Sequence, residues 1–147
     1  MMQTAAAQGL SARVNLGVQL VALLLAVALR AARPGLVTEF LVATVIAPLL
    51  ALLPAALAAA ALRLERLTAR LAVPFVLCAL SLVAFGALAP DVADGARWVP
   101  IFDLLGVRAR HPIRMDIVGR VLGAGYLLAL GWTAVRFRIE ARAAAGR

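Results

Sequence analysis

The sequence predicts an all-α fold, an integral membrane four-helix bundle with a short interfacial helix between spans three and four. The 147 residues are 65% hydrophobic and 15% charged, with a mean hydropathy of +1.00. A soluble domain is roughly 45–50% apolar and about 25% charged. The apolar residues gather in four runs near the length of about 20 residues that a membrane-spanning helix needs. Arginines border these runs, as they do beside lipid headgroups.

The first span is expected at residues 14–32, between Arg13 and the arginines that follow the run. Arginine side chains at both ends can extend this short run by reaching toward the headgroups. A cleaved signal peptide is the alternative. Arg30 and Pro34 beside the expected cleavage region argue against it, so we expect a retained helix.

The second span is expected as one helix at residues 36–62, with Pro48 and Pro54 inside it. Spanning helices tolerate proline where neighbouring helices satisfy the freed carbonyl groups. A split into two short re-entrant helices is the alternative. The third and fourth spans are expected at residues 71–89 and 117–136. Together the four spans form a single domain over residues 1–147.

The long connection at residues 90–116 contains a further helical pattern. Asp94-Gly95 predicts a turn. Four apolar residues then follow at i, i+3, i+4 and i+7, the spacing of one helix face: Trp98, Ile101, Phe102 and Leu105. Pro100 suits the first turn of this helix. We expect it to lie in the membrane interface as a connecting elbow, with a lid or partner surface as the alternative.

The charges indicate orientation and partners. Fifteen basic residues, all arginine, oppose seven acidic residues. Eight arginines border the side that holds both termini and six border the other side, so we expect both termini in the cytoplasm. The expected partner is the lipid bilayer, including anionic lipids, and no nucleic acid. The arginine and alanine bias indicates a bacterial protein, hence an inner-membrane location.

Apart from the arginines that flank the apolar runs, two ionisable residues lie inside the expected spans. Glu39 and Arg120 each lie one turn from the same, non-cytoplasmic interface, and Asp116 precedes Arg120 by one turn. Charges in lipid are costly and are usually paired or functional. We therefore expect Glu39, Asp116 and Arg120 to form an ionic clamp between spans two and four. A substrate or proton site is the alternative.

A basic cluster ends the long connection and consists of Arg108, Arg110, His111 and Arg114. Guanidinium groups match phosphate and carboxylate geometry. Contact with lipid headgroups is the expected role, and a specific anion site is the alternative.

Small and amide residues predict the helix contacts. Asn15 and Gln19 lie on one face of the first span, where amides can bond across helices. The second span carries a stripe of alanines at every fourth position, beginning with Ala43, Ala47 and Ala51. Gly119 and Gly123 form a GxxxG pattern in the fourth span. We expect spans two and four to make the tightest contact, with the GxxxG pattern serving either this bundle or a homodimer.

The chain lacks the common catalytic motifs. Its one cysteine, Cys78, and one histidine, His111, cannot form a multi-histidine or cysteine-only metal site. No nucleophile elbow, Walker lysine or dinucleotide-binding glycine motif is present. We therefore expect no metal, no cofactor and no enzymatic activity.

The expected function is that of a structural, assembly or accessory subunit of a membrane complex. Its partner would be another membrane protein or a second copy in a homo-oligomer. A small oligomeric transporter or channel for an anionic or amphipathic solute is the alternative. A membrane enzyme that acts on a lipid substrate through His111 is a third hypothesis.

Overall fold

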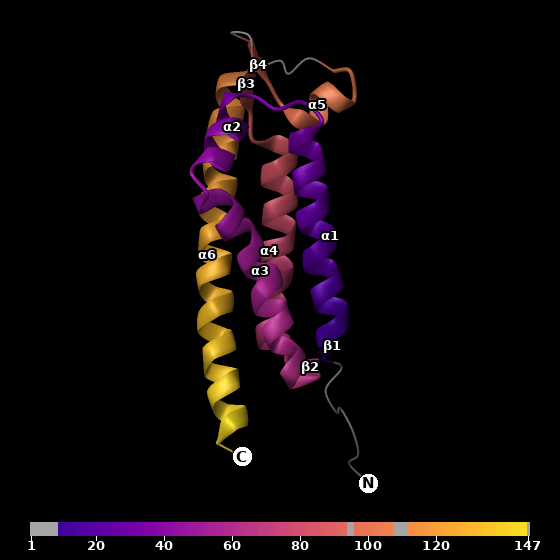
Figure 1. Cartoon of the computed structure of the whole chain (residues 1–147), viewed down its shortest axis with the longest axis vertical. Coiled ribbons are helices and arrows are strands. Elements are labelled where there is room, and N and C mark those ends of the chain that lie inside the picture. The colour runs from indigo at the N-terminus through magenta and orange to yellow at the C-terminus, as the bar shows by residue number, and fades with distance from the viewer. Residues whose placement is uncertain (1–8, 94–95, 108–111, 147) are drawn as a thin grey trace.

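The computed structural model describes residues 9–93, 96–107 and 112–146, and over these residues the chain is mostly helical (Figure 1). The expected all-α class is confirmed, with two very short antiparallel strand pairs added, β1 with β2 and β3 with β4. In chain order the elements are β1 (Leu10–Ser11), α1 (Ala12–Ala31), α2 (Leu36–Ala43), α3 (Ile46–Ala60), the 3₁₀ helix η1 (Ala61–Leu64), β2 (Arg66–Leu67), α4 (Ala69–Leu88), β3 (Asp91–Ala93), β4 (Ala96–Trp98), α5 (Pro100–Leu104) and α6 (Pro112–Ala145).

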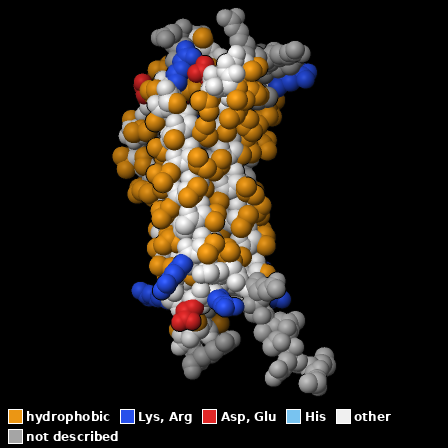
Figure 2. All heavy atoms as spheres, turned by 90° about the vertical axis from the view of Figure 1, so that its right-hand side faces the viewer, with side chains coloured by type: hydrophobic (Ala, Val, Ile, Leu, Met, Phe, Trp, Pro, Cys, Tyr) orange, Lys and Arg blue, Asp and Glu red, His pale blue; other side chains and the backbone are white. Residues whose placement is uncertain are grey.

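Four helices are long and apolar enough to cross a membrane: α1, α3 with η1, α4, and α6 from Asp116 onward. They run side by side along the long axis of the molecule, and β1 lies at the same end as the last turn of α6 (Figure 1). Hydrophobic side chains cover the length of the visible face, and the charged side chains gather at its two ends (Figure 2). This distribution suggests a multi-pass membrane protein.

Helix α4 is the centre of the packing. It contacts α6 and α1 most extensively, and α3 contacts α6 much less. One buried cluster joins α4 to α1, η1 and β2 around Leu71 and Phe75, and a second joins α4 to α6 and α1 around Cys78 and Leu82. The expectation that spans two and four make the tightest contact is therefore wrong, because α4 lies beside α6 along most of its length.

The glycines of α6 explain this contact. A Cβ atom on Gly119 would lie 3.2 Å from the Cα atom of Ala89, and one on Gly123 would lie 3.4 Å from the ring of Phe85. Small residues allow two helix backbones to approach closely. The GxxxG pattern thus serves the interior of this chain, against the end of α4.

The second apolar run is two helices rather than one. α2 ends at Ala43 and α3 begins at Ile46, so the expected single helix over 36–62 is wrong. Val45 between them has a φ of 60°, which is strained for a β-branched residue. The chain continues in the same general direction through the break, so it does not form the re-entrant pair that was the alternative (Figure 1).

Local chemistry accounts for the position of the break. Pro48 has no N–H to donate to the carbonyl of Thr44, and its ring would clash with that carbonyl in a continuous helix. The residues before it are rich in β-branched side chains, which lower helix propensity. The Thr44 hydroxyl donates instead to the carbonyl of Leu41, at 2.9 Å. Pro48 then falls in the first turn of α3, where proline is tolerated.

Pro54 lies inside α3, and a neighbouring helix compensates for it. A proline at this position leaves the carbonyl of Leu50 without its usual helical donor. The Tyr126 hydroxyl of α6 donates to this carbonyl at 2.5 Å. The contact between α3 and α6 therefore satisfies a backbone group that lipid could not.

The connection after α4 differs in part from the expectation. β3 and β4 pair as an antiparallel hairpin, and its expected turn at Asp94-Gly95 lies outside the described residues. Pro100 begins α5 as expected, but the helix spans only Pro100–Leu104. Trp98 belongs to β4 and is buried, whereas Leu105 is exposed. The strand consequently removes Trp98 from the predicted amphipathic face.

Tyr126→Phe is expected to lower the free energy of unfolding by roughly 0.6–2 kcal/mol, because the Leu50 carbonyl loses its donor. The same change in a Pro54→Ala background should cost measurably less, since the restored N–H of residue 54 can bond that carbonyl. Reversible unfolding of all four variants in detergent micelles measures both costs. Equal costs in the two backgrounds would contradict this role of Tyr126.

Candidate functional site

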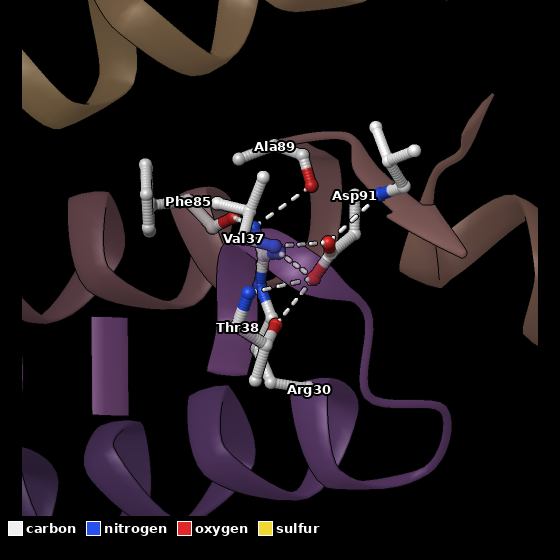
Figure 3. Close-up of polar contacts among 7 residues, drawn as sticks. Arg30, Val37, Thr38, Phe85, Ala89 and Asp91 are labelled. Atoms are coloured by element: carbon white, nitrogen blue, oxygen red, sulfur yellow. Dashed lines mark hydrogen bonds and ion pairs between the residues drawn. The ribbon is translucent and has the colours of Figure 1, made fainter. Parts of the chain in front are cut away.

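A densely hydrogen-bonded polar cluster lies where α1 and α4 end and α2 begins. Its centre is a buried ion pair (Figure 3). Arg30, in the last turn of α1, and Asp91, the first residue of β3, are 9% and 0% exposed. The Nη1 atom of Arg30 lies 3.3 Å from Oδ2 of Asp91. We call Arg30, Asp91 and the groups that bond them the Arg30–Asp91 cluster.

Asp91 holds the beginning of α2. Its carboxylate accepts hydrogen bonds from the backbone N–H groups of Val37 at 2.9 Å and Thr38 at 3.1 Å, and from the Thr38 hydroxyl. These are first-turn donors of α2 that have no partner within the helix. The negative charge also complements the positive end of the helix dipole. Asp91 therefore caps α2 from a strand more than fifty residues away in the sequence.

Arg30 holds the end of α4 in the complementary way. Its Nη2 atom donates to the carbonyls of Phe85 at 3.1 Å and Ala89 at 2.8 Å. The guanidinium also lies over the Phe85 ring, 5.3 Å from its centroid. A cation at the carboxyl end of a helix is favourable because the last carbonyls lack helical partners. One ion pair thus joins three helix ends.

Gly35, the residue before α2, makes room for this arrangement. A Cβ atom at Gly35 would overlap the carboxylate of Asp91. Glycine is therefore required by the close approach of Asp91 and of the Val92 carbonyl oxygen, which would lie 2.8 Å from that Cβ atom. Its extended backbone, with φ −122°, is open to other residue types.

The environment of Asp91 favours its charged form. Burial by itself raises the pKa of a carboxyl group, but the Thr38 hydroxyl and the backbone N–H groups of Val92, Val37 and Thr38 bond the charged form and outweigh burial. The pKa of Asp91 consequently lies below its ordinary value. The ion pair is charged at neutral pH.

Two exposed ion pairs lie at the same end of the molecule. Arg33 pairs with Asp103 of α5 at 2.9 Å, and Arg97 of β4 pairs with Asp116 of α6 at 2.6 Å. Arg33 also lies over the Trp98 ring at 5.5 Å. These pairs connect the loops to the helices, and exposed pairs of this kind contribute little to stability.

Of the two amides predicted to bond across helices, Gln19 does so, and Asn15 is bonded only by Gln19 of the same helix. Asn15 and Gln19 are buried between α1 and α4, and Gln19 donates to the carbonyl of Phe75 at 3.0 Å. Gln19 also lies 3.5 Å from the side-chain oxygen of Asn15, whose Nδ2 atom is buried without a partner among the described residues. Between α4 and α6, the Sγ atom of Cys78 lies 3.4 Å from the Oγ1 atom of Thr133.

The predicted clamp of Glu39, Asp116 and Arg120 is not formed. Asp116 pairs with Arg97, and neither Glu39 nor Arg120 belongs to an ion pair of the described chain. Both are exposed. Asp116 and Arg120 lie one turn apart on the same side of α6. Arg97 of β4 pairs with Asp116, so Asp116 is not paired with Arg120. The real clamp is Arg30–Asp91, which joins α1 to the loop after α4.

The remaining predicted residues are mostly peripheral. Ala43 is exposed and Ala47 and Ala51 are half-buried, because the break before α3 interrupts the alanine stripe; the buried small residues of α3 are Ala55 and Ala58. Of the basic cluster, Arg108, Arg110 and His111 lie outside the described residues. Arg114 is exposed at the start of α6.

One sequence signal could have identified Arg30. The buried residues of α1 follow a helical spacing that continues through Ala22 and Ala26 to Arg30. The amide face predicted at Asn15 and Gln19 therefore ends on a charged residue, which needs a buried partner. Asp91 follows Pro90, outside the apolar runs, so no helical spacing in the sequence connects it to Arg30.

The described residues contain no group of three or more histidine, cysteine, aspartate or glutamate side chains that could hold a metal ion. A hollow of about 660 Å³ lies at the opposite end of the molecule from the Arg30–Asp91 cluster, lined by Gly9, Leu10, Ser11, Glu65 and Arg66. No known protein family, curated protein or solved structure matches this chain.

Asp91→Ala is expected to lower the free energy of unfolding by about 3–5 kcal/mol, because it leaves Arg30 buried without a counter-charge. Asp91→Asn should cost less, since its amide oxygen can still accept bonds from α2. Thermal unfolding in lipid nanodiscs gives the order of the two variants. Equal stability of Asp91→Ala and the parent would contradict the role assigned to Asp91.

Gly35→Ala is expected to destabilise the parent, because the added methyl group overlaps the Asp91 carboxylate. In an Asp91→Ala background the same substitution should cost less, because only the overlap with the Val92 carbonyl oxygen, at 2.8 Å, remains. The test is a double-mutant cycle on unfolding temperature. Additive losses would show that Gly35 is needed for a reason other than Asp91.

The ion pair also predicts a pH dependence. Because the folded-state pKa of Asp91 is lowered, its contribution is complete above the unfolded value of about 3.9 and is lost as pH falls through the folded value. The stability difference between the parent and Asp91→Asn should therefore shrink below about pH 4 and stay constant from pH 5 to 8. Unfolding curves across this range measure it.

Proposed function

We propose that the protein is a non-enzymatic subunit of a membrane complex, a structural, assembly or accessory component. It would insert as a bundle of four spans in a bacterial inner membrane, with both termini in the cytoplasm. The helix lengths, the apolar flanks and the charged ends support insertion. The arginine excess at the end that holds β1 and the last turn of α6 supports the orientation.

The observation that carries this proposal is how the buried polar side chains are used. Within residues 9–93, 96–107 and 112–146, each of the five buried polar residues forms at least one hydrogen bond: Asn15, Gln19, Arg30, Asp91 and Thr133. They hold helices to one another and form no continuous row across the molecule. A carrier needs polar groups that face a solute along its path. An interior of this kind favours a structural role over transport of a solute.

The small oligomeric transporter or channel is the second candidate, and the break between α2 and α3 favours it. Many carriers for small solutes use discontinuous spanning helices at their binding sites. Against it, Glu39 and Arg120 do not form the gate that this reading requires. Uptake of an anionic solute into proteoliposomes that is lost in Glu39→Gln would support this candidate.

Orientation is tested by labelling single cysteines in a Cys78→Ala background. Ala69 and Ala96 are exposed near opposite ends of the molecule and are the positions to change. A membrane-impermeant maleimide added to intact cells is expected to label Ala96→Cys and to spare Ala69→Cys until the cells are opened. The reverse pattern would overturn the proposed orientation.

The subunit role is tested by isolating the tagged chain from its native membrane in nanodiscs. We expect a complex of fixed stoichiometry, identified by mass spectrometry, and no solute flux when the purified chain alone is reconstituted. A chain that is monomeric in native membranes and conducts a solute by itself would overturn the proposal.

A further inference from the structure

The break between α2 and α3 is exposed on the outside of the molecule. Val42 and Val45 are 61% and 60% exposed, and Ile46 is 63% exposed. No residue of α2 is buried. The last bonds of α2 run from Thr44 to Phe40 and from Val45 to Val42, and the first bond across the break into α3 runs from Leu49 to Val45. The backbone at the break therefore leaves the regular helical pattern, and none of the described residues buries it.

In the proposed insertion, the break lies at the depth of the hydrocarbon. At 1.5 Å per residue, the eight residues of α2 place it about 12 Å below Gly35. Gly35 is level with the Arg30–Asp91 cluster, at the upper end of α1 and α4. Irregular backbone at such depth is tolerated where protein or a water-filled cavity covers it, and not where it faces lipid. Another protein surface is therefore needed over Val45.

The charges next to the break identify the kind of surface. Glu39 is exposed on α2, one to two turns above the break, among exposed apolar residues that include Leu36 and Phe40. A carboxylate there favours a partner that brings a cation to the same depth. Below that cation the partner must be apolar, to match Val42 and Val45.

This chain itself presents such a surface on α6. Arg120 is exposed and belongs to no ion pair of the described residues. Exposed Ala124 and Leu128 follow it one and two turns below. α2 and α6 begin at the same end of the molecule (Figure 1). Arg120 lies about 6 Å along α6 from Asp116, and Glu39 lies about 6 Å along α2 from Gly35.

We propose that a second copy of this chain covers the break between α2 and α3, with Arg120 of one copy paired with Glu39 of the other. The contact places charge against charge near the interface and apolar side chains against apolar side chains below it. This inference rests on the proposed subunit role and names its partner surface. It also assigns a use to Glu39 and Arg120, which form no ion pair with the residues that the structure describes.

Charge reversal tests the pairing. Two differently tagged copies are co-expressed, the membranes are dissolved into nanodiscs large enough for an oligomer, and recovery of one tag through the other is measured. Glu39→Arg alone and Arg120→Glu alone should each reduce recovery at least tenfold. The double variant Glu39→Arg/Arg120→Glu should restore it. Arg138→Glu, a reversal of an exposed arginine near the other end of α6, is the matched control and should leave recovery unchanged.

Because both residues are exposed, the single variants should keep the helical circular-dichroism spectrum of the parent, which separates lost association from misfolding. A parent that shows no self-recovery, or a double variant that recovers no better than the singles, would overturn the inference.

A photo-crosslinking residue at Val45 gives an independent measurement. An adduct of twice the chain mass is expected from Val45, and none from the equally exposed Leu24 of α1. An adduct to a different membrane protein would overturn self-association while leaving the subunit role intact. Adducts to lipid alone would overturn both the partner surface and the proposed function.

Discussion

Backbone polar groups in an apolar medium must find partners within the protein, and the Arg30–Asp91 cluster meets this constraint at three helix ends at once. Asp91 accepts hydrogen bonds from the free N–H groups at the start of α2, and Arg30 donates to the carbonyls at the end of α4. Each charge also opposes the helix dipole that it meets. The two ions balance one another, so the burial of each is tolerated because of the other.

The same constraint explains the details along the second apolar run. Pro54 frees a carbonyl, and Tyr126 of the neighbouring helix supplies the missing donor. Among the described residues, none gives the break at Val45 a comparable cover. The contrast between these two positions is the physical basis of the proposal that a second copy of the chain covers Val45.

Much of the architecture was predictable because it follows from local sequence. Apolar runs of about 20 residues specify spanning helices, since a helix satisfies its own backbone wherever its neighbours lie. The amide face of α1 was predictable for a related reason: two amides one turn apart in an apolar helix need a neighbour to bond. Pro100 likewise predicted the start of α5, because the fixed φ of its ring suits the first turn of a helix.

The site was not predictable in the same way. Glu39 and Arg120 were expected to pair because they have opposite charges at similar depth, and depth is all that a linear pattern provides. The rotation of each helix about its axis depends on its packing, and the glycine contacts against α4 set the rotation of α6. Asp91 follows the end of a helix, and only the folded chain brings it to Gly35 and Arg30. The sequence by itself therefore determined which segments are helices long and apolar enough to span a membrane, apart from the break in the second run, because length and apolar character depend on each residue's own chemistry. Which charges meet was decided by the tertiary structure, because a pair exists only once two distant helices adopt their relative position and rotation.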